Sequence, residues 1–404
     1  MTLKAYVIVS CILFVILAGF VYKDSKIERI ENREKNYTIQ DNVESIGYES
    51  GKKVYNIKIK KVLQKSYRHI LYVNELIDGS IYNNDETIVV KNITGTQGRV
   101  NTHLKSLLVT GNISALIEPT TSTKSISVQA HGFRYNNQKK QSSFFNNIIL
   151  NVSRQVLSAP KFNYDTNSET VIFPEILTIT TEHSKTLTNQ AIINVKNSQI
   201  ITTQNIETEY FKKATENDSD QVKDLLKSKT FIKAKNMSLN FSDNDFSVID
   251  YDTNVIITQD DKKLLSDKLH INFKDNIYKA ESNIVLELES LKWSLNKDRK
   301  IKNKTINDML SKKTIIKSNL AKFDHKKNKI FFDGSVIAKQ NNFKLTCNSM
   351  VYDIKSEKII LLGSVKVYKF GIEHLNTNKI IIDIRNETFT TDSKDKLSEI
   401  MIEI

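Results

Sequence analysis

The side chains that most often carry out chemistry occur in this chain, but they are not arranged for it. The seven histidines are scattered along the sequence, and none belongs to an H-E-x-x-H motif or another paired spacing. No G-x-S-x-G elbow, phosphate-binding loop or G-x-G-x-x-G motif is found either. The sequence therefore predicts a protein that is not an enzyme and that uses no cofactor.

Two other groups of residues could bind a metal or act as nucleophiles. Four aspartates lie close together at Asp250, Asp252, Asp260 and Asp261. No glycine stands at the turn of a calcium-binding loop there and no glutamate closes one, so we interpret them as exposed turn carboxylates and expect no metal site. Cys11 lies in an apolar segment and Cys347 stands alone, with no histidine nearby in sequence to activate either thiol.

The net charge of +13 is spread along the chain, with acidic residues between the basic ones. No pattern of basic and aromatic residues indicates a nucleic-acid partner, and solvated strand faces explain most of the charge. Attraction to an anionic membrane or glycolipid is a second interpretation. The basic segment Lys292–Lys317, which contains the only tryptophan, Trp293, is either an exposed connector or a contact for anionic head groups or sugar phosphates.

The N-terminal segment Ala5–Tyr22 is continuously apolar over 18 residues. As a helix it would reach about 27 Å, close to the hydrocarbon thickness of a bilayer. A cleaved signal peptide is the competing interpretation, but the apolar run is long for one and lacks a small-x-small cleavage site. We therefore predict a membrane anchor over residues 1–22, a charged stalk over residues 23–41, and an exported remainder.

A strand-turn-strand pattern is repeated through the last two-thirds of the chain. Gly334-Ser335-Val336 matches Gly363-Ser364-Val365, 29 residues further on. A second pair of copies, Asp224–Ala234 and Asp308–Ser318, lies 84 residues apart. A fixed period of this kind indicates one supersecondary unit that is copied and stacked. Before the strand of each copy in this second pair, apolar residues at i, i+3 and i+4 predict a short helix: Val222, Leu225 and Leu226 in one, and Ile306, Met309 and Leu310 in the other.

Within the copies, apolar and polar residues alternate, as in Leu269–Lys274. Alternation with period two predicts strands with one buried face, and the short connections predict antiparallel pairing. Leu107–Ile113 is expected to run into a Gly-Asn turn and out again. The predicted fold is all-β: a single transmembrane helix followed by one or more elongated antiparallel jelly rolls. Their apolar face either closes into a packed core or leaves a groove for another apolar body.

The repeated phrase resembles the periplasmic bridge proteins of the lipopolysaccharide transport system, the LptC/LptA (OstA-like) family. The segment Ile330–Phe389 carries the resemblance, with its G-x-V-x-h…L-x-x-x-x-h-x-h-D pattern, where h is apolar. The N-terminal anchor points to the LptC type, although the chain is longer than a usual LptC. The resemblance gives an N-terminal LptC-like β region at residues 42–155 and an OstA-like repeat region at residues 156–397.

The resemblance implies a non-enzymatic, single-pass protein of the inner membrane with most of its chain in the periplasm. It would receive lipopolysaccharide from the inner-membrane ABC transporter and pass it to an LptA-type jelly roll docked on the last strands. Acyl chains would lie against inward apolar residues, for which the candidates are Val336, Ala338, Leu345, Val365, Val367, Ile380 and Ile382. The alternative is an anchored structural or adhesive β-repeat protein with a closed core and no lipid cargo.

Overall fold

The computed structural model describes residues 37–65, 68–120, 125–152, 154–211, 227–240, 248–292 and 301–391. These residues form two compact units: unit 1 comprises Met1–Glu118 and Val128–Phe144, and unit 2 comprises Pro119–Ser127 and Phe145–Ile404. The predicted anchor, residues 1–22, lies outside the described part of the chain. Within that part, no helix is both long and apolar enough to cross a membrane.

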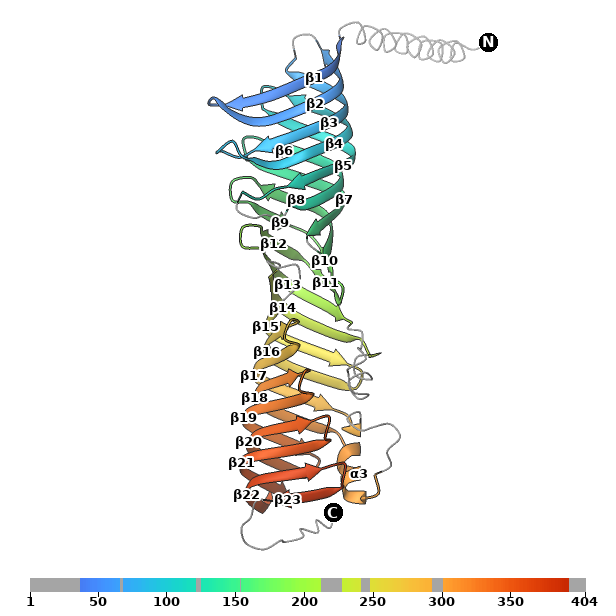
Figure 1. Ribbon diagram of the computed structural model, residues 1–404, viewed down its shortest axis with the longest axis vertical. Helices are drawn as coiled ribbons and strands as arrows, with labels where there is room; N and C mark the ends of the chain where they lie inside the picture. The colour runs from blue at the N-terminus through green and yellow to red at the C-terminus, as the bar shows by residue number, and fades with distance from the viewer. Residues whose placement is uncertain are drawn as a thin grey trace, which may run out of the picture. The chain divides into compact units, whose positions relative to one another are not determined.

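Both units are built from antiparallel strands, which confirms the all-β prediction (Figure 1). Unit 1 contains β1 (Tyr37–Glu49), β2 (Lys52–Lys65), β3 (Ile70–Tyr82), β4 (Ile88–Asn101), β5 (Ser106–Ile117), most of β6 (Ile126–Asn136) and the start of β7 (Gln141–Val152). The first strand begins within the segment predicted as a stalk.

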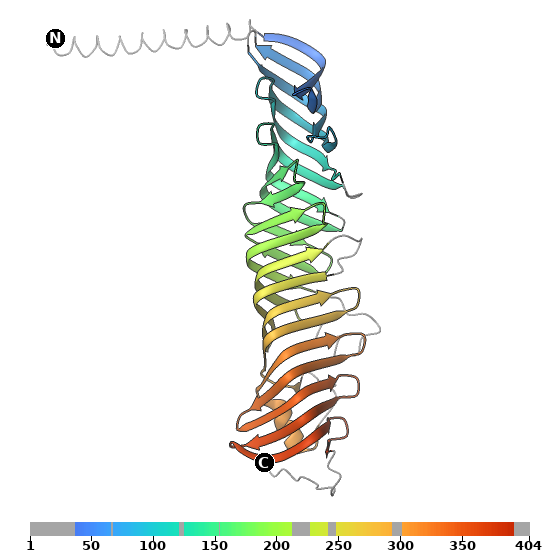
Figure 2. The same ribbon diagram turned by 90° about the vertical axis from the view of Figure 1, so that its left-hand side faces the viewer.

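Unit 2 contains shorter strands first and then a regular series in which each strand pairs with the next in sequence. Figure 2 shows this series stacked, with hairpin turns on both sides. The elements are β8 (Gln155–Asp165), β9 (Thr170–Phe173), β10 (Leu177–Thr180), β11 (Ser184–Thr188), β12 (Gln190–Asn194), β13 (Gln199–Tyr210), β14 (Thr230–Asn240), β15 (Val248–Gln259), β16 (Lys262–Asn272), β17 (Ile277–Leu288), α3 (Lys304–Ser311), β18 (Thr314–Asp324), β19 (Lys329–Gln340), β20 (Phe343–Asp353), β21 (Lys358–Lys369), β22 (Ile372–Asp383) and β23 (Thr388–Thr391).

Alternate strands of the repeat end in a turn that an aspartate side chain stabilises. In three of these turns an aspartate Oδ1 accepts a hydrogen bond from a backbone N–H three residues on: Asp324 from Lys327, Asp353 from Ser356 and Asp383 from Asn386. Burial raises the pKa of Asp383, but hydrogen bonds from Asn386 and Lys358 outweigh it and hold that pKa below its usual value. Two of these turns begin at a repeated Asp-Ile pair, Asp353-Ile354 and Asp383-Ile384.

The feature that shapes unit 2 is a bend in the middle of each long strand. In alternate strands two consecutive residues adopt positive φ, and the pairing register shifts at the same point. The pairs are Gln204-Asn205, Thr253-Asn254, Ser282-Asn283, Gly334-Ser335 and Gly363-Ser364. In strands that face them, a hydroxyl donates to a carbonyl two residues on: Ser266 to Lys268, Ser318 to Leu320 and Thr377 to Lys379. Such bulges bend a strand without ending it.

A bend of the same kind in unit 1 corrects the prediction of a turn at the Gly-Asn pair. Gly334-Ser335 lies inside β19 and Gly363-Ser364 lies inside β21. Gly111-Asn112 likewise lies inside β5, where both residues have positive φ. Two consecutive residues in the left-handed region also make a tight hairpin turn, so the local sequence is the same in both cases. Only the pairing of the flanking strands distinguishes a bend from a reversal.

Each bend divides a strand into two segments. The segments of successive strands lie side by side and form two walls. One row of paired aliphatic residues runs along the first wall, one residue per strand, from β14 to β22; we call it the aliphatic row, and it contains Ile232, Ile257, Leu264, Leu286, Ile316, Ala338, Leu345, Val367 and Leu375. On the second wall a paired row contains Ala280, Ala321, Phe332, Met350, Leu361 and Ile380. The two walls of unit 2 therefore present apolar faces to each other.

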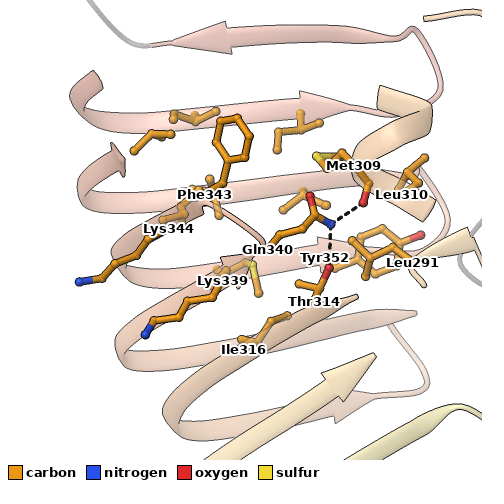
Figure 3. A pocket seen from close by; sticks show the side chains of 18 of the residues that line it. Leu291, Met309, Leu310, Thr314, Ile316, Lys339, Gln340, Phe343, Lys344 and Tyr352 are labelled. Atoms are coloured by element: carbon orange, nitrogen blue, oxygen red, sulfur yellow. Dashed lines mark hydrogen bonds between the residues drawn. The ribbon is translucent and has the colours of Figure 1, made fainter. Parts of the chain in front are cut away.

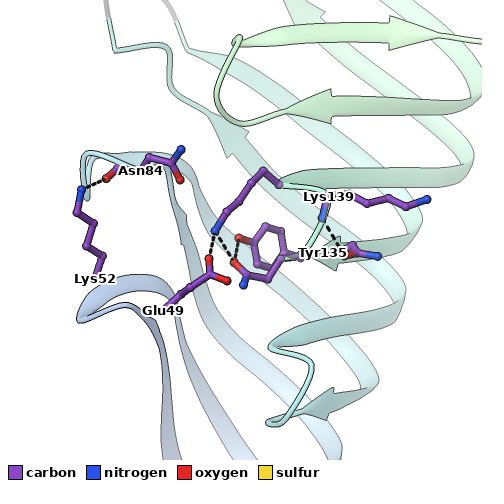
Figure 4. Close-up of polar contacts among 8 residues, drawn as sticks. Glu49, Lys52, Asn84, Tyr135 and Lys139 are labelled. Carbon is purple, nitrogen blue, oxygen red and sulfur yellow. Dashed lines mark hydrogen bonds and ion pairs between the residues drawn. The ribbon is translucent and has the colours of Figure 1, made fainter.

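Unit 1 has a filled interior. Its inward residues Val90, Val109, Phe133 and Phe144 are completely buried, and the rings of Phe133 and Phe144 are 4.8 Å apart. Polar contacts tie the β1–β2 hairpin to the turn after β6 (Figure 4): the Lys140 ammonium pairs with Glu49 and donates to Asn137, and Tyr135 donates to the same Asn137 oxygen. Hydrogen bonding from Lys140 holds the pKa of the Glu49 carboxyl below its usual range.

The bend predicts that Gly363→Ala destabilises unit 2 more than Gly371→Ala. Both glycines have positive φ, which disfavours a Cβ by about 1–2 kcal/mol. A Cβ at Gly363 would also lie 2.5 Å from Nδ2 of Asn348, whereas one at Gly371 would meet nothing within 4 Å. Denaturant unfolding of the two variants measures the difference. Equal losses of stability would show that close packing at the bend is unimportant.

Candidate functional site: an apolar groove in unit 2

A cavity of about 480 Å³ lies between the two walls of unit 2, in the size range of small-molecule sites. Both walls contribute to its lining. The first wall supplies Ile316, Ala338, Leu345, Val367 and Leu375, and the second supplies Ile330, Phe332, Met350, Tyr352, Ile359, Leu361, Ile380 and Ile382. The cavity is thus an apolar groove whose base is the line of strand bends.

Five of the seven residues predicted to face a groove line this cavity: Ala338, Leu345, Val367, Ile380 and Ile382. The other two, Val336 and Val365, follow the bends directly and are completely buried. They pair with Cys347 and Thr377 at the base, so they support the groove without lining the cavity. The family resemblance that suggested these seven residues does not show how deep along the inward face the open space extends.

The aliphatic row is incompletely covered along most of its length. Of its nine members, only Ile232 and Ile316 are buried, and the other seven are partly exposed. In a filled interior, inward aliphatic side chains are normally covered completely by the layer packed against them, as they are in unit 1. Partly exposed aliphatic residues in a continuous row indicate an apolar surface without its own cover.

A second cavity of about 260 Å³ lies next to the first along the strands. Leu286, Leu288, Ile330 and Phe332 line both cavities, so the two are neighbouring compartments of one groove. At the far end of the second, the hydroxyls of Tyr210 and Tyr278 lie 3.0 Å apart. Burial raises the pKa of Tyr210 well above its usual value, so this hydroxyl stays protonated at physiological pH.

Before this point in unit 2 the interior is filled. Phe162 and Phe173 face each other with ring centroids 5.6 Å apart, and both are almost completely buried. Leu157, Ile179 and Ile193 are buried to the same degree. On β11 and β13 the positions in line with the aliphatic row are two buried threonines, Thr186 and Thr208. Their hydroxyl oxygens lie 2.9 Å apart. The incompletely covered surface therefore belongs to β14–β23.

Helix α3 lies across the mouth of the groove. Its residues Met309 and Leu310 line the larger cavity, and Ile306 and Leu310 are completely buried. At its start, the Asn303 side chain accepts from the Ile306 N–H, as an N-cap does. The Glu387 carboxylate, in the turn at the end of the second wall, accepts from the backbone N–H groups of Lys302 and Asn303, the latter at 2.5 Å.

The other end of α3 is held by the first wall. Nε2 of Gln340, at the end of β19, lies 2.6 Å from the Met309 carbonyl oxygen and 3.0 Å from the Thr314 hydroxyl (Figure 3). The backbone N–H of Leu291 and the hydroxyl of Ser290 donate to the Leu310 carbonyl. These bonds satisfy carbonyls that a helix end leaves free. The helix is thus a strap fixed to both walls.

The short helix predicted around Ile306, Met309 and Leu310 is confirmed, and it leads directly into β18. The matching helix predicted around residues 222–226 lies outside the described residues, as does Trp293. The contacts of α3 could not be predicted, because Gln340 and Glu387 are remote from the helix in sequence. The sequence signal that could have indicated such a helix packed on the groove was an amphipathic segment placed between two strand pairs.

The reactive side chains are not gathered in this groove. Across the described ranges, no group of three or more His, Cys, Asp or Glu side chains could hold a metal ion. Asp250 is not in a turn, as the sequence suggested, but on β15, where it lies 2.7 Å from Nδ1 of His270 on β16. Cys347 is buried at a bend, and burial raises the pKa of its thiol to about 11.

Comparison with solved structures finds similarity to a bacterial protein. No family model and no curated protein matches the chain. The crystal structure of LptH from Pseudomonas aeruginosa, described as the LptA-homologous periplasmic component of the lipopolysaccharide transport device, matches at 13% identity with a TM-score of 0.25. The match covers 33% of this chain and 82% of that one. Similarity at this level does not by itself indicate a shared function.

Loss of the Gln340 side chain should loosen the strap without unfolding the walls. Gln340→Ala removes the donor to Met309 and Thr314, and an unsatisfied buried carbonyl costs about 1–3 kcal/mol. We expect faster amide hydrogen exchange in residues 304–311 and unchanged exchange in β20 and β21. Gln40→Ala, on exposed β1, is the control. Unchanged exchange in α3 after loss of Gln340 would mean that other contacts hold the helix.

Proposed function

We propose that this protein is a non-enzymatic lipid carrier that holds acyl chains in the groove of β14–β23. The observation that carries the proposal is the aliphatic row, which is partly exposed between two apolar walls instead of being covered by the fold. A groove with this lining is suited to a long, flexible apolar group. Burial of an acyl chain would contribute about 0.8 kcal/mol per CH₂, enough to retain it without covalent chemistry.

More specifically, we propose that the cargo is lipopolysaccharide. The protein would be an OstA-like component of lipopolysaccharide export, and its type would be that of LptC. The sequence that resembles this family, Ile330–Phe389, spans β19–β23, which supply most of the lining of the larger cavity. In this proposal residues 1–22 anchor the chain in the inner membrane and the strands lie in the periplasm. The inner-membrane ABC transporter of the system supplies the lipid, and no chemical step occurs on this chain.

The edge at the end of unit 2 is a suitable place for the next jelly roll to dock. Short β23 pairs only with Ile380–Asp383, so the first half of β22 has no strand on its outer side among the described residues. Ile372 and Phe370 there are 66% and 70% exposed. An open strand edge beside exposed apolar side chains favours addition of a partner's strand. We propose an LptA-type protein as that partner.

A structural or adhesive role is the second candidate, and unit 1 is the observation that favours it. Among its described residues, the interior is filled by fully buried aromatic and aliphatic side chains. A protein of such units alone would carry no lipid. In our proposal unit 1 is a support and the cargo site is confined to the later strands of unit 2.

Photo-crosslinking distinguishes these two functions. A benzophenone amino acid at Leu345 would lie in the groove, and one at the adjacent Thr346 would lie on the opposite face of β20. In cells that make lipopolysaccharide, we expect ultraviolet light to join it to the Leu345 variant and not to the Thr346 variant. Labelling of neither position, or of both equally, would count against a lipid in the groove.

A further inference from the structure

The two compartments of the groove differ in how they are covered. Helix α3 contributes Met309 and Leu310 to the lining of the larger cavity, and Leu291 joins them from the chain before the helix. Among the described residues that line the smaller cavity, none belongs to α3. A chain that occupied both compartments would therefore lie under the strap in one of them and beyond it in the other.

The C-terminal end of the strap is fixed to the first wall. Gln340 donates to the Met309 carbonyl, and the Leu291 N–H donates to the Leu310 carbonyl. The helix ends at Ser311, and β18 begins at Thr314 and pairs with the strands on both sides. Because the chain runs almost directly into a paired strand, this end of α3 cannot leave the wall without disrupting β18. It is suited to act as a hinge.

The N-terminal end of the strap is held on the second wall by the side chain of Glu387. The carboxylate accepts from the backbone N–H groups of Lys302 and Asn303, at 3.0 and 2.5 Å. Lys302 is exposed, and Asn303 and Glu387 are partly exposed. Water can replace hydrogen bonds that it can reach, so such bonds contribute little net stability. This contact can therefore open while both walls stay folded.

A second turn of unit 2 uses the same position to hold a crossing segment, but there the contact is buried. Glu169 follows Asp165 by four residues, as Glu387 follows Asp383, and both glutamates have positive φ. The Glu169 carboxylate accepts from the backbone N–H and the hydroxyl of Thr120. Glu169 is only 1% exposed, so that attachment is closed to water. The accessible contact of Glu387 distinguishes α3 as the segment that can be released.

The apolar side of α3 depends on the groove for its stability. Ile306 and Leu310 are completely buried, and Met309 is partly buried beside them. A helix of eight residues is not stable by itself, so it forms here because it packs on the walls and is tied at both ends. Met309 has a flexible side chain that can adapt to a neighbouring acyl chain. Segments with few contacts of this kind are the ones that open locally in folded proteins.

We propose that α3 is a latch over the larger compartment: it pivots on its C-terminal end, Glu387 holds it closed, and its opening sets how fast an acyl chain enters and leaves. This inference rests on the proposed function and adds the segment and the side chain that control exchange. Glu387 bonds the strap whether the groove is empty or filled. Its loss therefore changes both rates and leaves their ratio nearly constant.

Exchange of a fluorescent fatty acid tests the latch. cis-Parinaric acid, which fluoresces in apolar surroundings, is mixed with the purified full chain to measure association, and excess oleate then displaces it in a stopped-flow instrument. For Glu387→Ala we expect roughly tenfold faster dissociation and a similar gain in the association rate, as loss of a charge-assisted hydrogen bond predicts. The Kd should accordingly change less than about threefold.

Two further variants make the result specific. Glu387→Gln keeps an oxygen that can accept from the strap and should restore most of the wild-type rate. Glu373→Ala is the matched control: it removes the same charge from β22, where Glu373 lies 3.5 Å from Lys366 and lines neither cavity. It should exchange lipid at the wild-type rate. Amide hydrogen exchange in residues 304–311 should be faster in Glu387→Ala alone, with the β-sheet circular dichroism of every variant unchanged.

The outcomes separate the latch from the proposed function. An unchanged dissociation rate in Glu387→Ala, or the same acceleration in Glu373→Ala, would overturn the latch and leave lipid binding intact. Faster dissociation with an unchanged association rate would also overturn it, because that pattern indicates a loss of binding contacts. Failure of cis-parinaric acid to bind the wild-type protein would contradict the proposed function itself, and the latch with it.

Discussion

The structure of unit 2 depends on the bend in the middle of each strand. A strand that ran straight would place all its inward side chains on one flat face, and neighbouring sheets would have to cover it. Two consecutive residues in the left-handed region, as at Gly363-Ser364, turn the strand so that its two halves face each other. The same chain segment then supplies both walls. Repetition of the bend in register from strand to strand turns a local distortion into a continuous groove.

Whether the groove stays open depends on the volume of the side chains that project into it. Toward the start of unit 2, Phe162 and Phe173 fill the space between the walls and are almost fully buried. From β14 to β22 the aliphatic row contains no aromatic residue and includes Ala338 and Val367, while Ala280 and Ala321 stand on the second wall. The small side chains at these positions leave space that the fold does not fill, whereas protein interiors are normally close-packed. Helix α3 covers part of it from outside.

Much of this arrangement could be predicted from the sequence, because alternation and period are local properties. The all-β class, the antiparallel pairing and the short helix before β18 were predicted correctly. The bend at Gly111-Asn112 was predicted as a turn, since a left-handed dipeptide looks the same in both. The complete burial of Val336 could not be foreseen, because it depends on its distance from a bend. The strap was missed because Glu387 meets the start of α3 from 84 residues away.

The central claim is that the groove of β14–β23 holds a lipid, and native mass spectrometry of protein purified without detergent tests it most directly. The wild-type protein should retain a bound lipid. The variant Ala338→Phe/Val367→Phe, which fills the aliphatic row with larger side chains, should lose that lipid while keeping its β-sheet circular dichroism. A wild-type protein free of lipid, or equal lipid content in the wild type and the filled variant, would contradict the account.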